Sequence, residues 1–256
     1  MNDASIFLEE WKQQNDLLAF ESVRWNDRLV EIEKVRDGTY IEPIPTGIDR
    51  LNPHFNFFKG MLMLLTGYPQ SGKSELAKNF ASEWVMRKLG KVCMFSPESE
   101  IPILMNELDH INKLGAGMNN WFTFMEIKDQ KGMPQVHQII EEFERLSKEG
   151  HNFFVIDPLN WLTSSTYGST MYEALRLTLT YLKQFAKQTK SVVCYVEHPN
   201  NPQANRDGEY PKCSVYNVTG GAMHFKKCDG ILISHREKNL SEFGTPEMSK
   251  ADATLV

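Results

Sequence analysis

The chain has 256 residues, of which 41% are hydrophobic and 24% are charged, and its formal net charge is -5. These values are typical of a globular protein with a sizeable buried core, and they exclude disordered, collagenous and coiled-coil classes. The net negative charge falls within residues 1–43, so a nucleic acid would need a local basic patch, such as the modest basic excess of residues 183–238.

The N-terminal residues 1–36 carry apolar side chains at helical spacing, without an interior proline or glycine, which predicts a helical segment. Asp37, Gly38 and two prolines then interrupt this pattern and indicate a linker. We therefore expect a helical segment and linker in residues 1–43 and one main domain in residues 44–256. Residues 253–256 have the pattern of the start of a strand, so a truncated C-terminus is an open alternative.

Short apolar runs alternate with longer amphipathic segments from residue 61 onward. This alternation is typical of an α/β fold with a mostly parallel, twisted sheet flanked by helices. The strands are expected at Met61–Thr66, Val92–Phe95, Phe153–Ile156, Val192–Val196 and Gly230–Ser234. Apolar residues at helical spacing predict helices in residues 76–85, 136–146 and 172–186.

Residues 67–74 fit the pattern GxxxxGK[ST] between a predicted strand and a predicted helix. In this pattern glycines let backbone N–H groups surround phosphates, and the helix N-terminus favours negative charge. Lys73 reaches the terminal phosphates, where we also count it as catalytic, and the Ser74 hydroxyl coordinates Mg²⁺. The sequence thus predicts a P-loop for ATP or another NTP with Mg²⁺. Its residues are Gly67, Tyr68, Pro69, Gln70, Ser71, Gly72, Lys73 and Ser74.

Polar residues follow three further predicted strands. Asp157 has the position of a Walker B aspartate, which binds Mg²⁺ together with Ser74. Glu98 is a candidate for orienting the attacking water, with Glu100 as the competing candidate. Because ligands bind beyond the carboxyl ends of parallel strands, we expect Glu98, Asp157 and His198 to project toward the phosphates.

Several motifs occur together with the P-loop in a definite order along the chain. They are Thr46–Leu51, Phe95–Glu98, Ile156–Pro158, Val196–Pro199, Val218–Ala222 and His235–Arg236. In kind and order they resemble the RecA-like motor domain of hexameric replicative helicases of the DnaB and Twinkle type. The resemblance covers about residues 44–240, and the His-Pro pair after the fourth strand favours the Twinkle-like branch.

This resemblance implies an ATP-dependent DNA helicase, of suspected 5'–3' direction, in which a homohexamer couples NTP hydrolysis to translocation on single-stranded DNA. It also implies roles for three residues. Glu98 would activate water, His198 would sense the γ-phosphate, and Arg236 would lie against the nucleotide base. An arginine finger from a neighbouring subunit would complete each site. No basic residue follows Lys250, so the position of that finger is open.

The resemblance further implies that the loops of residues 200–211 and 216–227 contact single-stranded DNA. Polar and basic side chains there can bond phosphate oxygens, and glycines allow close approach of the backbone. The expected DNA-binding residues are Asn200, Asn201, Arg206, Gly220, Gly221, Lys226 and Lys227. A primase or another replisome protein is an expected partner, and the N-terminal segment would dock on a neighbouring subunit or pack on its own domain.

Two other functions stay open at this point. One is a RecA- or KaiC-like DNA-associated ATPase without unwinding, and the other is a catalytically idle nucleotide-binding regulatory module. Glu197 is unexpected beside His198, because an additional carboxylate near the phosphates repels nucleotide unless it turns away.

The apolar runs and the cysteines indicate where the protein resides. The runs are too short to span a bilayer, and the N-terminus does not resemble a signal peptide. The four cysteines form no CxxC pair, which argues against a zinc cage and a disulfide framework. We expect a cytoplasmic protein without a membrane partner, and a mitochondrial location is the alternative.

Overall fold

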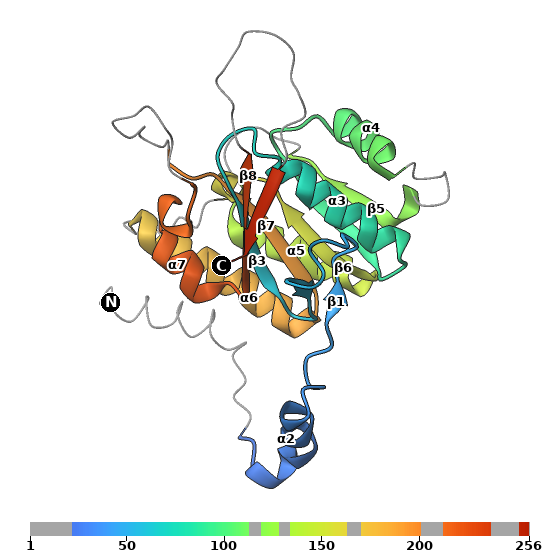
Figure 1. Ribbon diagram of the computed structural model, residues 1–256, viewed down its shortest axis with the longest axis vertical. Helices are drawn as coiled ribbons and strands as arrows, with labels where there is room; N and C mark the ends of the chain where they lie inside the picture. The colour runs from blue at the N-terminus through green and yellow to red at the C-terminus, as the bar shows by residue number, and fades with distance from the viewer. Residues whose placement is uncertain are drawn as a thin grey trace, which may run out of the picture. The chain divides into compact units, whose positions relative to one another are not determined.

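The computed structural model describes residues 22–112, 119–127, 134–162, 170–200, 212–236 and 251–255 (Figure 1). The chain divides into two compact units, Met1–Glu42 and Pro43–Val256, which are treated separately below. In the first unit the 3-10 helix η1 (Trp25–Arg28) leads into helix α2 (Leu29–Arg36). Arg24 before them is extended, so the predicted helix is interrupted there, and residues 1–21 of that prediction lie outside the described residues.

A seven-stranded sheet in the order β5-β4-β6-β7-β3-β8-β9 forms the centre of the second unit (Figure 1). Its neighbouring strands pair in parallel, except for β9, which runs antiparallel to β8. The strands are β3 (Leu62–Thr66), β4 (Lys91–Phe95), β5 (Phe122–Met125), β6 (His151–Ile156), β7 (Val192–Glu197), β8 (Gly230–Arg236) and β9 (Ala251–Leu255). A separate two-stranded sheet joins β1 (Ile44–Pro45) to β2 (Asn56–Phe57).

Helices cover both faces of the large sheet. They are α3 (Lys73–Met86), α4 (Ile101–Asn112), α5 (Val136–Lys148), α6 (Met171–Thr189) and α7 (Gly221–Lys227), with the 3-10 helices η2 (Asn119–Trp121), η3 (Leu159–Trp161) and η4 (Val215–Asn217). One hydrophobic cluster joins one face of the sheet to α5, α6 and α7, and a second joins the opposite face to α3 and α4. Among the described helices, none is long and apolar enough to cross a membrane.

Strand β3 shows why the sheet strands are continuously apolar. Leu62 and Leu64 point into the cluster with α5 and α6, whereas Met63 and Leu65 point into the cluster with α3. Because both faces are covered, all five residues of β3 are buried. Parallel strands with two covered faces lose the alternation of apolar and polar residues that marks a half-exposed strand.

The predicted α/β architecture is confirmed, including its five strands and three helices. Two helices and two sheet strands were not predicted, at least not in full. Helix α4 contains Pro102, which lies in the first turn, where a missing N–H donor costs little. Helix α7 is short and begins with glycines, and β5 is a four-residue strand at one end of the sheet order.

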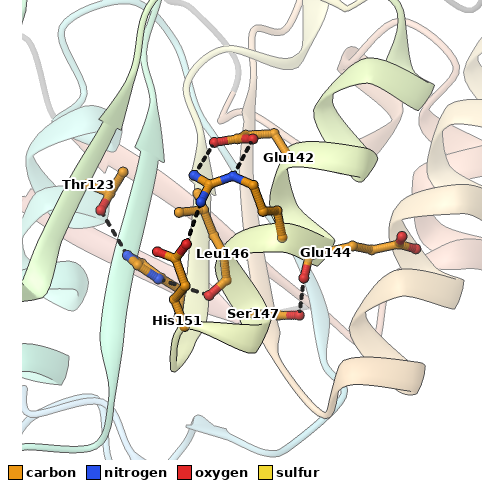
Figure 2. A network of polar contacts seen from close by, with 8 residues as sticks. Thr123, Glu142, Glu144, Leu146, Ser147 and His151 are labelled. Atoms are coloured by element: carbon orange, nitrogen blue, oxygen red, sulfur yellow. Dashed lines mark hydrogen bonds and ion pairs between the residues drawn. The ribbon is translucent and has the colours of Figure 1, made fainter.

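A polar network connects β5 to β6 and to the end of α5 (Figure 2). The buried imidazole of His151 lies 3.0 Å from the Leu146 carbonyl oxygen through Nδ1 and 2.8 Å from the Thr123 hydroxyl through Nε2. Since a carbonyl only accepts, Nδ1 carries the proton and Nε2 accepts from Thr123. Burial lowers the pKa of His151, while the Leu146 carbonyl opposes this shift.

We expect His151 to make the free energy of unfolding decrease as the pH is lowered. Its pKa is lower in the folded chain than in the unfolded one, so its contribution is complete above the unfolded pKa of about 6.5 and is lost as the pH falls through the folded pKa. Denaturant unfolding at several pH values should show a steeper loss for the wild type than for His151→Asn, by up to about 1.4 kcal/mol per pH unit. Equal slopes would contradict this assignment.

Candidate nucleotide-binding site

The strand order brings the predicted site residues to one edge of the sheet. Strands β4, β6, β7, β3 and β8 are consecutive neighbours and parallel, so their carboxyl ends lie at the same edge. Glu98 follows β4, Asp157 follows β6, and His198 follows β7. The P-loop joins β3 to α3 in the middle of this group, which is where ligands of open α/β sheets bind.

The P-loop has the backbone geometry of an anion site. Gly67 has a φ of +149°, Gly72 has a φ of +91° and directly precedes α3, and Gln70 between them also has a positive φ. The first backbone N–H groups of a helix have no partner within the helix, and here they begin at the buried Lys73. The Lys73 Nζ donates to the Tyr68 carbonyl oxygen at 3.0 Å, so the loop folds around this ammonium group.

Strand β8 supports the P-loop from behind. The Ser234 hydroxyl donates to the Ser71 carbonyl oxygen at 2.5 Å, and both residues are buried. A Cβ on Gly67 would lie only 2.1 Å from the Ser234 carbonyl oxygen, so a side chain at residue 67 cannot fit in this arrangement. The loop is therefore bonded to the sheet core as well as to its own turn.

Two buried hydroxyls of the P-loop suit a polar ligand. Within the described residues, the Tyr68 hydroxyl and the Ser71 hydroxyl are buried and have no hydrogen-bond partner. Unpaired buried polar atoms are uncommon in folded proteins, because leaving one unpaired costs about 1–3 kcal/mol. The loop therefore fits a group rich in acceptors, such as a chain of phosphates.

Asp157 and Ser74 form the pair expected to hold Mg²⁺. Asp157 is 9% exposed, and burial raises its pKa, while a hydrogen bond with Ser74 and the nearby His198 and Lys73 lower it. Lys73 in turn has a lowered pKa, chiefly through burial, with Asp157 opposing the shift. The described residues contain no cluster of three or more potential metal ligands. A site completed by phosphates and water suits Mg²⁺, which binds through one or two carboxylates.

The structure separates the two candidates for orienting water. The negative charge of Glu98 acts on both Asp157 and Glu197, which places this exposed carboxylate beside them. The carbonyl oxygen of Glu100 instead accepts from the N–H groups of Ile103 and Leu104, which gives Glu100 the position before the first turn of α4. Glu98 is thus the better candidate.

Glu197 lies at the end of β7 with its carboxylate bonded locally. Its Oε1 accepts the backbone N–H of His198 at 3.2 Å, and its backbone carbonyl accepts the Thr66 hydroxyl at 2.7 Å. Burial raises the pKa of Glu197 to about 7, opposed by the His198 N–H and assisted by the charge of Glu98. A carboxyl group that is largely protonated below pH 7 repels phosphates much less than an ionised one, which accounts for its presence here.

The predicted DNA-binding residues lie in another part of the structure, around η4 and α7. The Thr219 hydroxyl donates to the Asn200 side-chain oxygen at 2.9 Å, and the Lys227 ammonium donates to the Thr180 hydroxyl at 2.9 Å. Gly220 has a φ of +73° before the first turn of α7, which Gly221 begins. Lys226 is exposed. Asn201 and Arg206 lie outside the described residues.

Three further residues belong to the surroundings of the site. Arg236 ends β8, where its backbone pairs with Ala251, and its side chain is outside the described part of the structure. Ser234 and the buried Cys213, which interacts electrostatically with Lys73, were not predicted. Their sequence neighbourhoods contain no motif that marks them, because they reach the P-loop only through the order of the strands.

Comparison with known proteins supports the same fold. No known protein-family model matches the chain. It is 26% identical over 241 residues to the Twinkle homolog protein, chloroplastic/mitochondrial, of Arabidopsis thaliana, covering 84% of this chain but only 34% of that relative. A solved ATPase domain of a DnaB-like helicase superposes with a TM-score of 0.70 at 13% identity, covering 92% of this chain and 95% of that one. The predicted resemblance to the RecA-like domain of DnaB- and Twinkle-type helicases is confirmed.

We expect Gly67→Ala to destabilise the fold more than Gly150→Ala. Both glycines have a positive φ, which costs an alanine about 1–2 kcal/mol, but a Cβ on Gly150 meets no atom within 4 Å. The contact of a new Cβ with Ser234 should add about 1–3 kcal/mol at residue 67. Denaturant unfolding of both variants measures the difference, and equal losses would contradict the close packing of the loop on β8.

Proposed function

Since the chain has a RecA-like fold of the DnaB and Twinkle type, we propose that it is an NTP-dependent, ring-forming DNA helicase motor. The observation that carries this proposal is the gathering of Lys73, Ser74, Asp157 and Glu98 at one edge of the sheet. A P-loop alone is shared by many NTPases. A buried carboxylate bonded to the P-loop serine, with a second carboxylate beside it, is the arrangement that hydrolysis requires.

Each residue has a distinct task in this proposal. The backbone N–H groups of residues 67–74 and the Lys73 ammonium bind the phosphates, and Ser74 with Asp157 would hold Mg²⁺. When bound, Mg²⁺ neutralises charge that develops on the phosphate oxygens. Glu98 orients the attacking water and accepts its proton, and His198 donates a hydrogen bond to the γ-phosphate. Arg236 is proposed to lie against the base.

The assembly and the partners rest on the resemblance in sequence. We propose a homohexamer that encloses single-stranded DNA, moves in the 5'–3' direction, and contacts the DNA through the loops around residues 200–211 and 216–227. The chain spans about a third of the plant relative, whose printed name places that protein in chloroplasts and mitochondria. A primase or replisome partner and a cytoplasmic or mitochondrial location belong to the same proposal.

The hydrolysis step can be tested with three matched variants. Lys73→Ala should abolish nucleotide binding, because it removes the buried ammonium of the loop. Glu98→Gln should retain binding but lower turnover by about 10²–10⁴-fold, the usual contribution of a general base. Glu100→Gln, which alters the neighbouring carboxylate, should stay close to wild-type turnover. Turnover is measured as phosphate release with and without single-stranded DNA.

Different outcomes identify different functions. Stimulation of turnover by DNA together with unwinding of a forked duplex supports the helicase motor. Turnover without unwinding would support a RecA- or KaiC-like ATPase. Nucleotide binding without turnover in the wild type, even on DNA, would show an idle regulatory module and would contradict the role given to Glu98.

We expect nucleotide affinity to decrease as the pH rises through about 7, where Glu197 ionises. The new negative charge lies at the same edge of the sheet as the phosphates and repels them. Because the nucleotide's own phosphate also titrates near this range, the readout is the difference between wild type and Glu197→Gln in titrations at several pH values. Parallel curves for the two proteins would show that Glu197 does not influence nucleotide binding.

A further inference from the structure

Two exposed aromatic rings lie side by side on the surface formed by η4 and α7. Tyr216 is 69% exposed and Phe225 is 52% exposed, and their ring centroids are 6.5 Å apart with an angle of 29° between the planes. Single apolar side chains are common on protein surfaces, so one exposed ring needs no explanation. A roughly parallel pair that remains accessible to solvent offers a flat apolar surface to a planar ligand.

The backbone holds this aromatic pair in place. Gly221, which begins α7, has no room for a side chain, because a Cβ would lie 2.3 Å from the Val215 carbonyl oxygen. This close approach brings the first turn of α7 against η4, between the two rings in sequence. Val218 also pairs with Pro199, and the N–H of Asn200 donates to the Asn217 carbonyl oxygen at 2.8 Å, which ties η4 to the residues after β7.

A buried polar network fixes α7 to the sheet. His224 is fully buried, and its Nε2 lies 3.1 Å from the Thr219 carbonyl oxygen, so Nε2 carries a proton. Its Nδ1 therefore accepts from the Tyr195 hydroxyl of β7 at 2.7 Å, and the Cys228 thiol lies 2.9 Å from the same hydroxyl. With every member bonded, the network makes α7 a rigid support for Phe225.

The charge around the aromatic pair selects an anionic partner. The segment of residues 212–227 contains three lysines and no aspartate or glutamate. Lys212 and Lys226 are exposed, whereas Lys227 is partly buried against Thr180 of α6. Flat apolar rings next to exposed ammonium groups match the two components of a nucleic-acid strand, which are planar bases and phosphates.

We propose that Tyr216 and Phe225 form a stacking platform for a base of single-stranded nucleic acid, with Lys212 and Lys226 attracting the adjacent phosphates. This inference deepens the proposed function, on which it rests, since it assigns a contact to the bases as well as to the backbone. Stacking accepts every base, because each has an aromatic face, so the platform permits binding without sequence preference.

The test uses the full chain with Mg²⁺ and a slowly hydrolysed NTP analogue. Fluorescence anisotropy compares a labelled oligo(dT) with an abasic strand of the same length. The wild type should bind oligo(dT) about ten-fold more tightly than the abasic strand, and Tyr216→Ala and Phe225→Ala should each lose most of this difference. Tyr216→Phe should retain it, and Tyr181→Ala, at an exposed tyrosine of α6, should leave both affinities unchanged.

Thermal unfolding and light scattering accompany each variant, so that loss of folding or of assembly is seen directly. If the wild type binds oligo(dT) and the two alanine variants bind it equally well, the platform is refuted while the helicase proposal stands. If the wild type binds neither strand, both proposals fail together. If the alanine variants have a lower mass than the wild type, this surface joins copies of the chain and the stacking proposal is wrong.

Discussion

The burial of β3 is the constraint on which the rest of the structure depends. All five residues of this strand are inaccessible, and β7 and β8 bond to its two sides. A strand held in this way has one register and one direction, because a shift would move its apolar side chains out of both clusters. The P-loop begins where the strand ends, so the position of Lys73 and Ser74 follows from the packing of Leu62 to Leu65.

The same constraint explains how chemically different groups meet in one site. Asp157, His198 and Glu98 are far apart in the sequence, yet each follows a strand whose neighbours run in the same direction. Burial then adjusts their charges. Desolvation raises the pKa of Asp157 and of Glu197 and lowers that of Lys73, and each is opposed by a nearby group of opposite sign or a donor. The site is therefore a small set of charges that stabilise one another in a poorly solvated place.

The sequence contained the parts of this fold that depend on local pattern. The apolar runs predicted the five central strands, and the spacing of Gly67, Gly72 and Lys73 predicted the P-loop. It could not show Ser234 behind that loop, because this contact requires β8 to lie next to β3, and no local signal gives the strand order. It also missed α4, where Pro102 resembles a helix breaker although it lies in the first turn. The aromatic pair of Tyr216 and Phe225 depends on the close approach at Gly221, which is a tertiary contact.

The hydrogen bond from Ser234 to the P-loop links ligand binding to the cohesion of the whole sheet. Ser234 belongs to a strand that pairs with β3 on one side and with β9 on the other. Anything that binds the loop in its folded form adds its binding free energy to the stability of the folded chain. The nucleotide thus acts as part of the interior as well as a fuel. Substitutions deep in the sheet, far from any phosphate, should therefore appear in a selection for altered nucleotide affinity.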